Sequence, residues 1–223
     1  MTGYAAPVKL NDRGSGRVVD ILLCAPLPID PRGLAPKLSV EPATVGKLLV
    51  NLDRAGLIER AEASLVTGVH RRALVQAWSE DYSYVRSNRR MGWFIAPRGL
   101  PTLFRHLDKK EPMTVTGSLA ARRVLPPAIS NSLTLRLAAL FTPDPAGLAA
   151  RLGLIKVGPE TANVVIAAPF DPILFTSGAV VGGIRGVTIG RALVDLLTLP
   201  EPSAQEAVTI MDHLAATDPS WGH

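Results

Sequence analysis

Residues 32–60, RGLAPKLSVEPATVGKLLVNLDRAGLIER, constrain the fold most, because they predict two helices joined at a tight corner. Leu34, Ala35 and Leu38 recur at helical intervals. Pro42 suits the first turn of a second helix, where its missing N–H costs nothing. In that helix an apolar stripe recurs at i, i+3, i+4 and i+7, and it consists of Val45, Leu48, Leu49 and Leu52. We therefore expect a short helix, a corner and a longer amphipathic helix.

Gly56 and the residues after it predict how this segment ends. Glycine is preferred just past a helix C-terminus, and residues 57–60 then have the content of a short strand. Two helices at a tight corner, followed at once by a strand, are typical of a winged helix-turn-helix. The alternative is an ordinary helical hairpin in an all-α domain, which shares the apolar periodicity but needs no strand after Gly56.

The outer face of the second helix carries side chains that suit DNA. Four polar or basic residues lie off the apolar stripe: Thr44, Lys47, Asn51 and Arg54. We expect them to face the major groove, where Asn and Arg make bidentate hydrogen bonds to adenine and guanine edges. Two departures weaken the expectation of selective base readout. Glu41 stands where a Ser or Thr cap is usual, and Gly46 costs the helix about 1 kcal/mol relative to alanine.

Basic residues outside this helix are further candidates for contacts with phosphate. Arg60 ends the predicted strand, and Arg71 and Arg72 follow it. These two arginines fit either the return of a wing or the first turn of the next helix; we favour the helix and expect both to face the DNA. Arg89 and Arg90 stand among aromatic residues, so they either contact phosphate or form a solvated connection into a second domain.

Charge is uneven along the chain. Residues 1–110 contain 17 Lys and Arg against 10 Asp and Glu, a net charge of +7, whereas residues 111–223 contain 7 against 9, a net charge of −2. A basic module attracts the phosphate backbone by releasing condensed counterions. An excess of this size also arises by ordinary variation, so charge alone does not decide the matter.

The single cysteine and the absence of long apolar runs bear on where the chain works. Cys24 follows three apolar residues in an expected first helix over residues 15–23, capped by Ser15, and we expect its thiol to be buried. One cysteine cannot make a disulfide or a cysteine-based zinc site within one chain, which fits a reducing compartment. No run approaches the ~18 apolar residues of a membrane span. We therefore expect a soluble, cytoplasmic protein that does not enter a membrane.

The second half predicts a different architecture. From about Met91, short apolar runs that suit strands alternate with helical segments. Residues 134–141 alternate in polarity and predict a strand with one buried face, and PILF at 172–175 predicts another strand. The glycines between 178 and 186 fit a hairpin loop better than a phosphate-binding loop, because no GK[ST] follows. The fold class is α+β: a winged helix-turn-helix domain over residues 1–88, then a mixed α/β domain over residues 89–223.

Catalytic and metal-binding patterns are absent from the sequence. The four histidines are scattered, and Pro143-Asp144 lacks the Asp/Glu-x-Lys of a restriction-type nuclease. Asp171 and Asp195 are a separated acid pair, but we expect Asp171 in a turn and Asp195 on the outside of a helix. We therefore expect no catalytic residues, no metal, no cofactor and no enzymatic activity.

Several segments resemble the AbiEi antitoxins of type IV toxin–antitoxin systems. The most specific are VTGSLAARRV at 115–124, NVVIAAPFDPILF at 163–175 and GVTIGRALVDLL at 186–197, and the order of elements along most of the chain agrees. The resemblance implies an N-terminal winged helix that binds inverted repeats in its own promoter. It also implies a C-terminal domain that counteracts a nucleotidyltransferase-like toxin without forming a stable complex.

The sequence therefore predicts a DNA-binding transcriptional repressor of antitoxin type. Its expected partners are double-stranded operator DNA and, indirectly, a toxin, with the chain a monomer in solution or a dimer on DNA. Two alternatives stay open: a protein-interaction module with an incidental winged helix, and a degenerate nuclease or nucleotidyltransferase.

Overall fold

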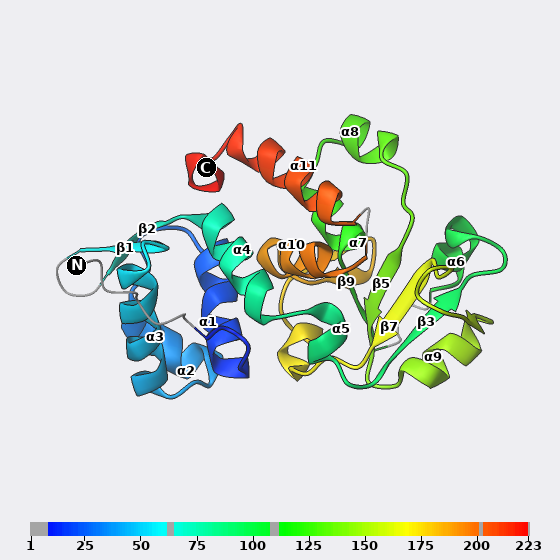
Figure 1. Ribbon diagram of the computed structural model, residues 1–223, viewed down its shortest axis with the longest axis horizontal. Helices are drawn as coiled ribbons and strands as arrows, with labels where there is room; N and C mark the ends of the chain where they lie inside the picture. The colour runs from blue at the N-terminus through cyan, green and yellow to red at the C-terminus, as the bar shows by residue number, and fades with distance from the viewer. Residues whose placement is uncertain (1–8, 62–64, 108–111, 201–202, 223) are drawn as a thin grey trace. The chain divides into compact units, whose positions relative to one another are not determined.

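A computed structural model describes residues 9–61, 65–107, 112–200 and 203–222 (Figure 1). The structure is mixed α+β, as the sequence predicts. It divides into two compact units, the first formed by residues 1–82 with 211–223 and the second by residues 83–210. The predicted domains meet instead at residues 88 and 89 and leave all C-terminal residues in the second domain. No helix in the described ranges is long and apolar enough to cross a bilayer.

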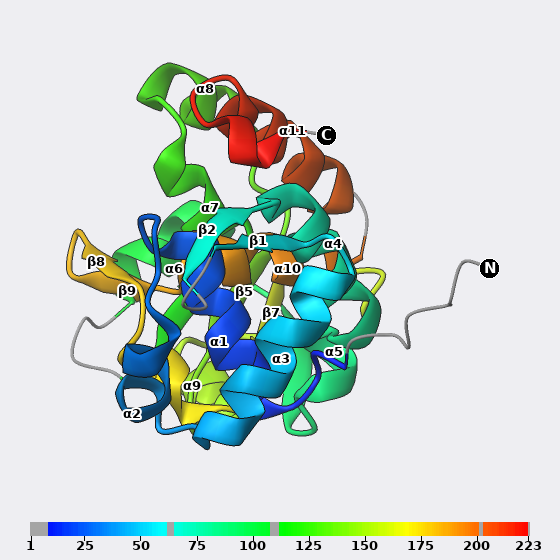
Figure 2. The same ribbon diagram turned by 90° about the vertical axis from the view of Figure 1, so that its left-hand side faces the viewer.

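Three helices pack together in the first unit: α1 (Arg13–Cys24), α2 (Leu34–Leu38) and α3 (Pro42–Arg54), with a 3-10 turn η1 (Pro31–Gly33) before α2 (Figure 2). The side chain of Asp12 caps α1 by accepting from the N–H of Ser15 at 2.9 Å, so Ser15 lies inside the first turn. The buried face of α1 carries Val18, Val19, Leu22 and Leu23. Cys24 lies off this face and is exposed, so the expectation of a buried thiol is wrong.

A two-stranded antiparallel hairpin follows α3. Its strands are β1 (Ile58–Arg60) and β2 (Val66–Val69), and residues 62–64 lie outside the described residues. The chain between α1 and η1 also joins the hairpin, because Ile29 and Val66 exchange N–H···O bonds of 2.9 and 3.0 Å. This pairing links the helices to the hairpin, and the sequence pattern did not predict it.

Helix α4 (Arg71–Asp81) completes the first unit together with the C-terminal segment. Trp78 and Tyr82 are buried, with ring centroids 6.2 Å apart. The last residues of α11 (Ser203–Ala215) and the 3-10 turn η5 (Pro219–Trp221) belong to this unit, and η5 packs on α4 with Trp221 buried.

A seven-stranded mixed sheet forms the centre of the second unit. In sheet order its strands are β6 (Ile155–Lys156), β3 (Met91–Ile95), β7 (Val164–Ala167), β5 (Ala138–Phe141), β4 (Thr114–Thr116), β9 (Ile184–Gly186) and β8 (Ala179–Val181). The β7–β5 and β4–β9 pairs are parallel, and the other neighbours are antiparallel. Every residue of β4, β5 and β7 is buried, so the centre of the sheet is covered on both faces.

Helices surround this sheet. They are α5 (Tyr84–Ser87), α6 (Leu100–His106), α7 (Ser118–Ala121), α8 (Pro127–Ser132), α9 (Pro145–Arg151) and α10 (Ile189–Thr198), with 3-10 turns η3 (Arg122–Val124) and η4 (Pro172–Phe175). Helices α7 and α10 contact β4, while α9 contacts β3 and β7. The Tyr84 hydroxyl of α5 donates to the carbonyl of Leu140 in β5 at 2.8 Å, which fixes α5 to the sheet.

The second unit departs from the sequence prediction at two strands. The strand expected over residues 134–141 is only Ala138–Phe141, and it does not alternate because both of its faces are buried. PILF forms the 3-10 turn η4 instead of a strand, because the Asp171 side chain accepts from the N–H of Ile173 and starts the turn. The glycine-rich segment forms the β8–β9 hairpin, as expected, with Gly182 and Gly183 at positive φ.

Candidate nucleic-acid interface

Helix α3 is held by the apolar stripe that the sequence predicts. Val45, Leu48, Leu49 and Leu52 are all buried. Pro42 occupies the first turn, and Gly56 follows the helix at φ 68°. Glu41 precedes the helix without making a side-chain cap bond, so this departure from the usual pattern is real. The stripe therefore determines which side of α3 faces outward.

The outer side of α3 presents the four residues predicted to read DNA. Thr44, Lys47 and Arg54 are exposed and Asn51 is half-buried. Within the described part of the chain, none of these four side chains has a hydrogen-bond or ion-pair partner. Their polar groups are therefore available to a ligand without breaking an internal contact.

Helix α2, which contacts α3, carries one more exposed cation before the corner between them. Ser39 adopts a left-handed conformation, φ 51°, and its N–H bonds to the carbonyl of Pro36. The Arg17 guanidinium donates to the carbonyl of Leu38 at 2.7 Å, which fixes the end of α2 to α1. Lys37 is exposed on α2 just before the corner. Lys37 was not among the predicted contacts, although its position off the stripe of Leu34, Ala35 and Leu38 in the sequence indicates an exposed side chain.

Arg60 lies on β1, half-buried, with its Nε enclosed and without a hydrogen-bond partner among the described residues. The hairpin also carries an acid, since Glu59 is exposed and lies 3.5 Å from Nε2 of His70. A carboxylate on this surface opposes contact with phosphate. The hairpin is therefore a weaker candidate surface than α3.

Arg71 and Arg72 do not lie on a free surface. Arg71 donates to Asp218 at 2.5 Å, to Ser220 at 2.6 Å and to the carbonyl of Ala25 at 3.2 Å. Arg72 is 7% exposed. Its guanidinium pairs with Asp212, and its Nε donates to the carbonyl of Trp221 at 3.0 Å. These arginines hold the C-terminal segment to α4, so their expected role on the DNA side is not supported by the geometry.

Arg89 and Arg90 are exposed and lie in the second unit, directly before β3. The carbonyl of Arg90 accepts from the N–H of Ala168 at 2.8 Å, which fixes the backbone there while the side chain stays outside. Both arginines fit the predicted alternative, a solvated connection into the second domain. They belong to the second unit, whereas α3 belongs to the first.

Two carboxylates of the first unit have shifted pKa values. A side-chain hydrogen bond from Arg32 lowers the pKa of Asp30, and the pair is exposed. At Asp218, burial raises the pKa, but hydrogen bonds from Ser220 and the charge of Arg71 outweigh it, and the pKa is lowered. The Arg32 charge near α2 is thus partly neutralised by Asp30.

The acids considered for catalysis are structural. Asp195 is fully buried in α10, not on its outside as expected, and accepts from the Thr116 hydroxyl at 2.5 Å. Asp171 is buried and caps η4. Among the described residues, no group of three His, Cys, Asp or Glu side chains forms a candidate metal site. Comparisons with protein-family models, curated proteins and solved structures gave no match to this chain.

Proposed function

We propose that this protein is a DNA-binding transcriptional regulator whose first unit is a winged helix-turn-helix. The observation that carries the proposal is the outer side of α3, where Thr44, Lys47 and Arg54 are exposed and Asn51 is half-buried. None of these four side chains has a partner among the described residues. Thr44 and Arg54 are about 15 Å apart along the helix axis, enough for the helix to follow several base pairs in a major groove about 12 Å wide. Lys47 and Arg54 supply the positive charge, and Asn51 supplies an amide for a base edge.

The order of elements supports the winged-helix part of the proposal. A helix, a paired segment at Ile29, two helices at a corner and an antiparallel hairpin follow one another, which is the winged-helix order. In helix-turn-helix docking the first helix of the pair crosses the phosphate backbone. We expect Lys37 on α2 to make such a contact and Arg60 on β1 to make another. Arg71 and Arg72 take no part in this interface.

The resemblance to AbiEi antitoxins supports a more specific form of the same proposal. In this form the chain represses its own promoter and counteracts a nucleotidyltransferase-like toxin without forming a stable complex. Co-expression of the neighbouring gene with and without this chain tests that role, and a toxin that this chain does not relieve contradicts it.

A gel-shift assay with the DNA upstream of the protein's own gene tests DNA binding. Lys47→Ala with Arg54→Ala should abolish the specific shift and leave thermal unfolding unchanged. The matched control is Arg105→Ala with Arg136→Ala, which removes two exposed charges from the second unit and should leave the shift intact. An unchanged shift in the α3 double variant would show that α3 is not the reading helix. Absence of duplex binding by the unaltered protein would favour an interaction module.

A further inference from the structure

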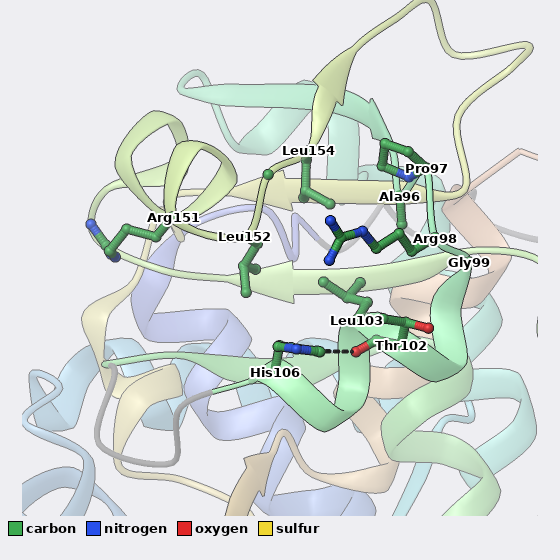
Figure 3. Close-up of a pocket in the computed structure, with 11 residues that line it drawn as sticks. Ala96, Pro97, Arg98, Gly99, Thr102, Leu103, His106, Arg151, Leu152 and Leu154 are labelled. Carbon is green, nitrogen blue, oxygen red and sulfur yellow. Dashed lines mark hydrogen bonds between the residues drawn. The ribbon is translucent and has the colours of Figure 1, made fainter.

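The second unit contains a pocket of about 550 Å³ that the proposed function does not use. It lies among the turn after β3, helix α6 and the end of α9 (Figure 3). Three basic residues line it, Arg98, His106 and Arg151, and none of the lining residues in the described ranges is acidic. Its size is within the roughly 300–1,000 Å³ that is usual for small-molecule sites. The lining therefore favours a small anionic ligand.

The turn that carries Arg98 is fixed by the backbone. The N–H of Gly99 bonds to the carbonyl of Ala96 at 2.9 Å, and the N–H of Ala96 bonds to the side chain of Asn163 at 2.8 Å. Gly99 has φ 76°, a conformation that side chains rarely adopt. Arg98 therefore projects from a well-supported position, which lowers the entropic cost of holding a ligand.

The opposite wall is fixed in a similar way at the end of α9. The N–H of Gly153 bonds to the carbonyl of Ala150 at 3.1 Å, and the N–H of Leu154 bonds to the carbonyl of Ala149 at 2.9 Å. These two bonds, with Gly153 at φ 63°, make a Schellman motif. The motif sets Leu152 and Leu154 on the wall of the pocket.

The Arg98 guanidinium is the charged group that lies over the pocket. In Figure 3 its guanidinium reaches over the pocket between Leu103 and Leu154, whereas Arg151 extends away at the rim. Within the described ranges, the Arg98 side chain has no hydrogen-bond or ion-pair partner. Nδ1 of His106 donates to the carbonyl of Thr102 at 2.8 Å, which leaves the other ring nitrogen for a ligand.

Apolar surface lies directly beside this guanidinium. Leu103 is 5% exposed, and Leu152 and Leu154 are half-buried. An inorganic anion would gain nothing from these leucines, whereas a ligand with an anionic group and a flat organic part would use both features. A guanidinium is suited to bidentate hydrogen bonding with a phosphate.

We propose that this pocket binds a small organic phosphate of mononucleotide size. The phosphate pairs with Arg98, the flat ring lies against Leu103, Leu152 and Leu154, and His106 supplies a polar contact to the ring or sugar. The site belongs to the second unit alone and is independent of the proposed DNA surface on α3.

Isothermal titration calorimetry on the full-length protein tests the site with four probes: AMP, UMP, adenosine and inorganic phosphate. We expect at least one nucleotide to bind at micromolar to low millimolar concentration, at least tenfold more tightly than adenosine or inorganic phosphate. Arg98→Gln should weaken nucleotide binding about tenfold or more. The control Arg136→Gln removes an exposed arginine that does not line the pocket and should change binding less than twofold.

Thermal unfolding of Arg98→Gln verifies that this exposed turn residue is not needed for folding. Leu154→Ala is a second variant, which should weaken the binding of nucleotide but not the binding of inorganic phosphate. Three results would overturn the proposal: no nucleotide binding at 5 mM, equal affinity for nucleotide and inorganic phosphate, or equal losses in Arg98→Gln and Arg136→Gln. Because Arg98→Gln leaves α3 intact, its gel shift should stay unchanged, so failure of this site and failure of DNA binding are separate results.

Discussion

Helices α3 and α4 both carry basic residues that the sequence assigned to DNA, but the structure uses them differently. On α3, Lys47 and Arg54 project outward without partners among the described residues. On α4, Arg71 and Arg72 bind acids and carbonyls of the C-terminal segment. A basic residue is available to phosphate only if no nearer acid in the fold has already paired with it.

The difference arises from residues more than a hundred positions away. Asp212 and Asp218, which pair with α4, lie in a segment that sequence reasoning placed in the other domain. Arg72 also fills a buried position, where an unpaired cation would be costly. The comparison therefore distinguishes the candidate DNA-binding surface on α3 from a structural contact, called the clasp below, in which Arg71 and Arg72 bind the C-terminal segment. Four experiments test this distinction.

The largest expected effect is on the stability of the first unit. Arg72→Ala removes a buried side chain and leaves the carbonyl of Trp221 without its donor, so the free energy of unfolding should fall by about 2–3 kcal/mol. Asp212→Asn should cost less, about 1 kcal/mol, because the amide oxygen can still accept a hydrogen bond from Arg72 and the Asp212 side chain is 59% exposed. Urea unfolding in a Trp93→Phe background makes Trp78 and Trp221, both of the first unit, the only fluorescent tryptophans.

The same variants show whether the clasp also reaches DNA. If Arg72→Ala unfolds like the unaltered protein but loses DNA affinity, then Arg72 binds phosphate and the distinction between α3 and α4 is wrong.

The second effect is on the salt dependence of DNA binding. Lys47→Ala should weaken binding to the operator about tenfold and reduce the slope of log K against log salt by about 0.9, as expected for the loss of one phosphate contact. Asp212→Asn leaves α3 unaltered and changes only the partner of Arg72 on α4, so it serves as the comparison; its slope should match that of the unaltered protein. Equal slopes for all three proteins would mean that Lys47 does not contact phosphate.

Gly46 offers a smaller gain in stability. A Cβ at this position meets no atom within 4 Å, so Gly46→Ala should raise the free energy of unfolding by about 0.5–1 kcal/mol through helix propensity alone. The measurement is urea unfolding, paired with a gel shift. Loss of DNA affinity in a more stable variant would indicate that the α3 backbone approaches the duplex closely at Gly46.

The smallest effect is the acid sensitivity of the clasp. Because the folded pKa of Asp218 lies below its ordinary value of 3.8, this group stabilises the fold above that value, and the contribution is lost as the pH falls through the lower folded pKa. Asp218→Asn should remove this part of the pH dependence below the ordinary value of 3.8. The Asp218 side chain is 41% exposed, so solvent screening keeps the effect small. An unchanged acid-unfolding profile would contradict the role of the Arg71–Asp218 pair.

The local features of α3 could be read from the sequence because they depend on neighbours in the chain. The buried stripe, Pro42 in the first turn and Gly56 after the helix are consequences of helical period and backbone conformation. The same local reasoning failed for Asp195, which is buried in α10 and accepts a hydrogen bond from Thr116, a residue of another element. It also missed the pocket around Arg98, whose walls come from segments about fifty residues apart.

By itself, the sequence determined the α+β class, the amphipathic helix from Pro42 and the outward set of Thr44, Lys47, Asn51 and Arg54, since each depends on periodicity within a few turns. Only the tertiary structure decided which arginines are engaged, that the chain returns from residue 211 to the first unit, and that the central strands are buried on both faces. These outcomes depend on contacts between residues far apart in the chain, and a local pattern of polarity does not identify which distant residues will be in contact.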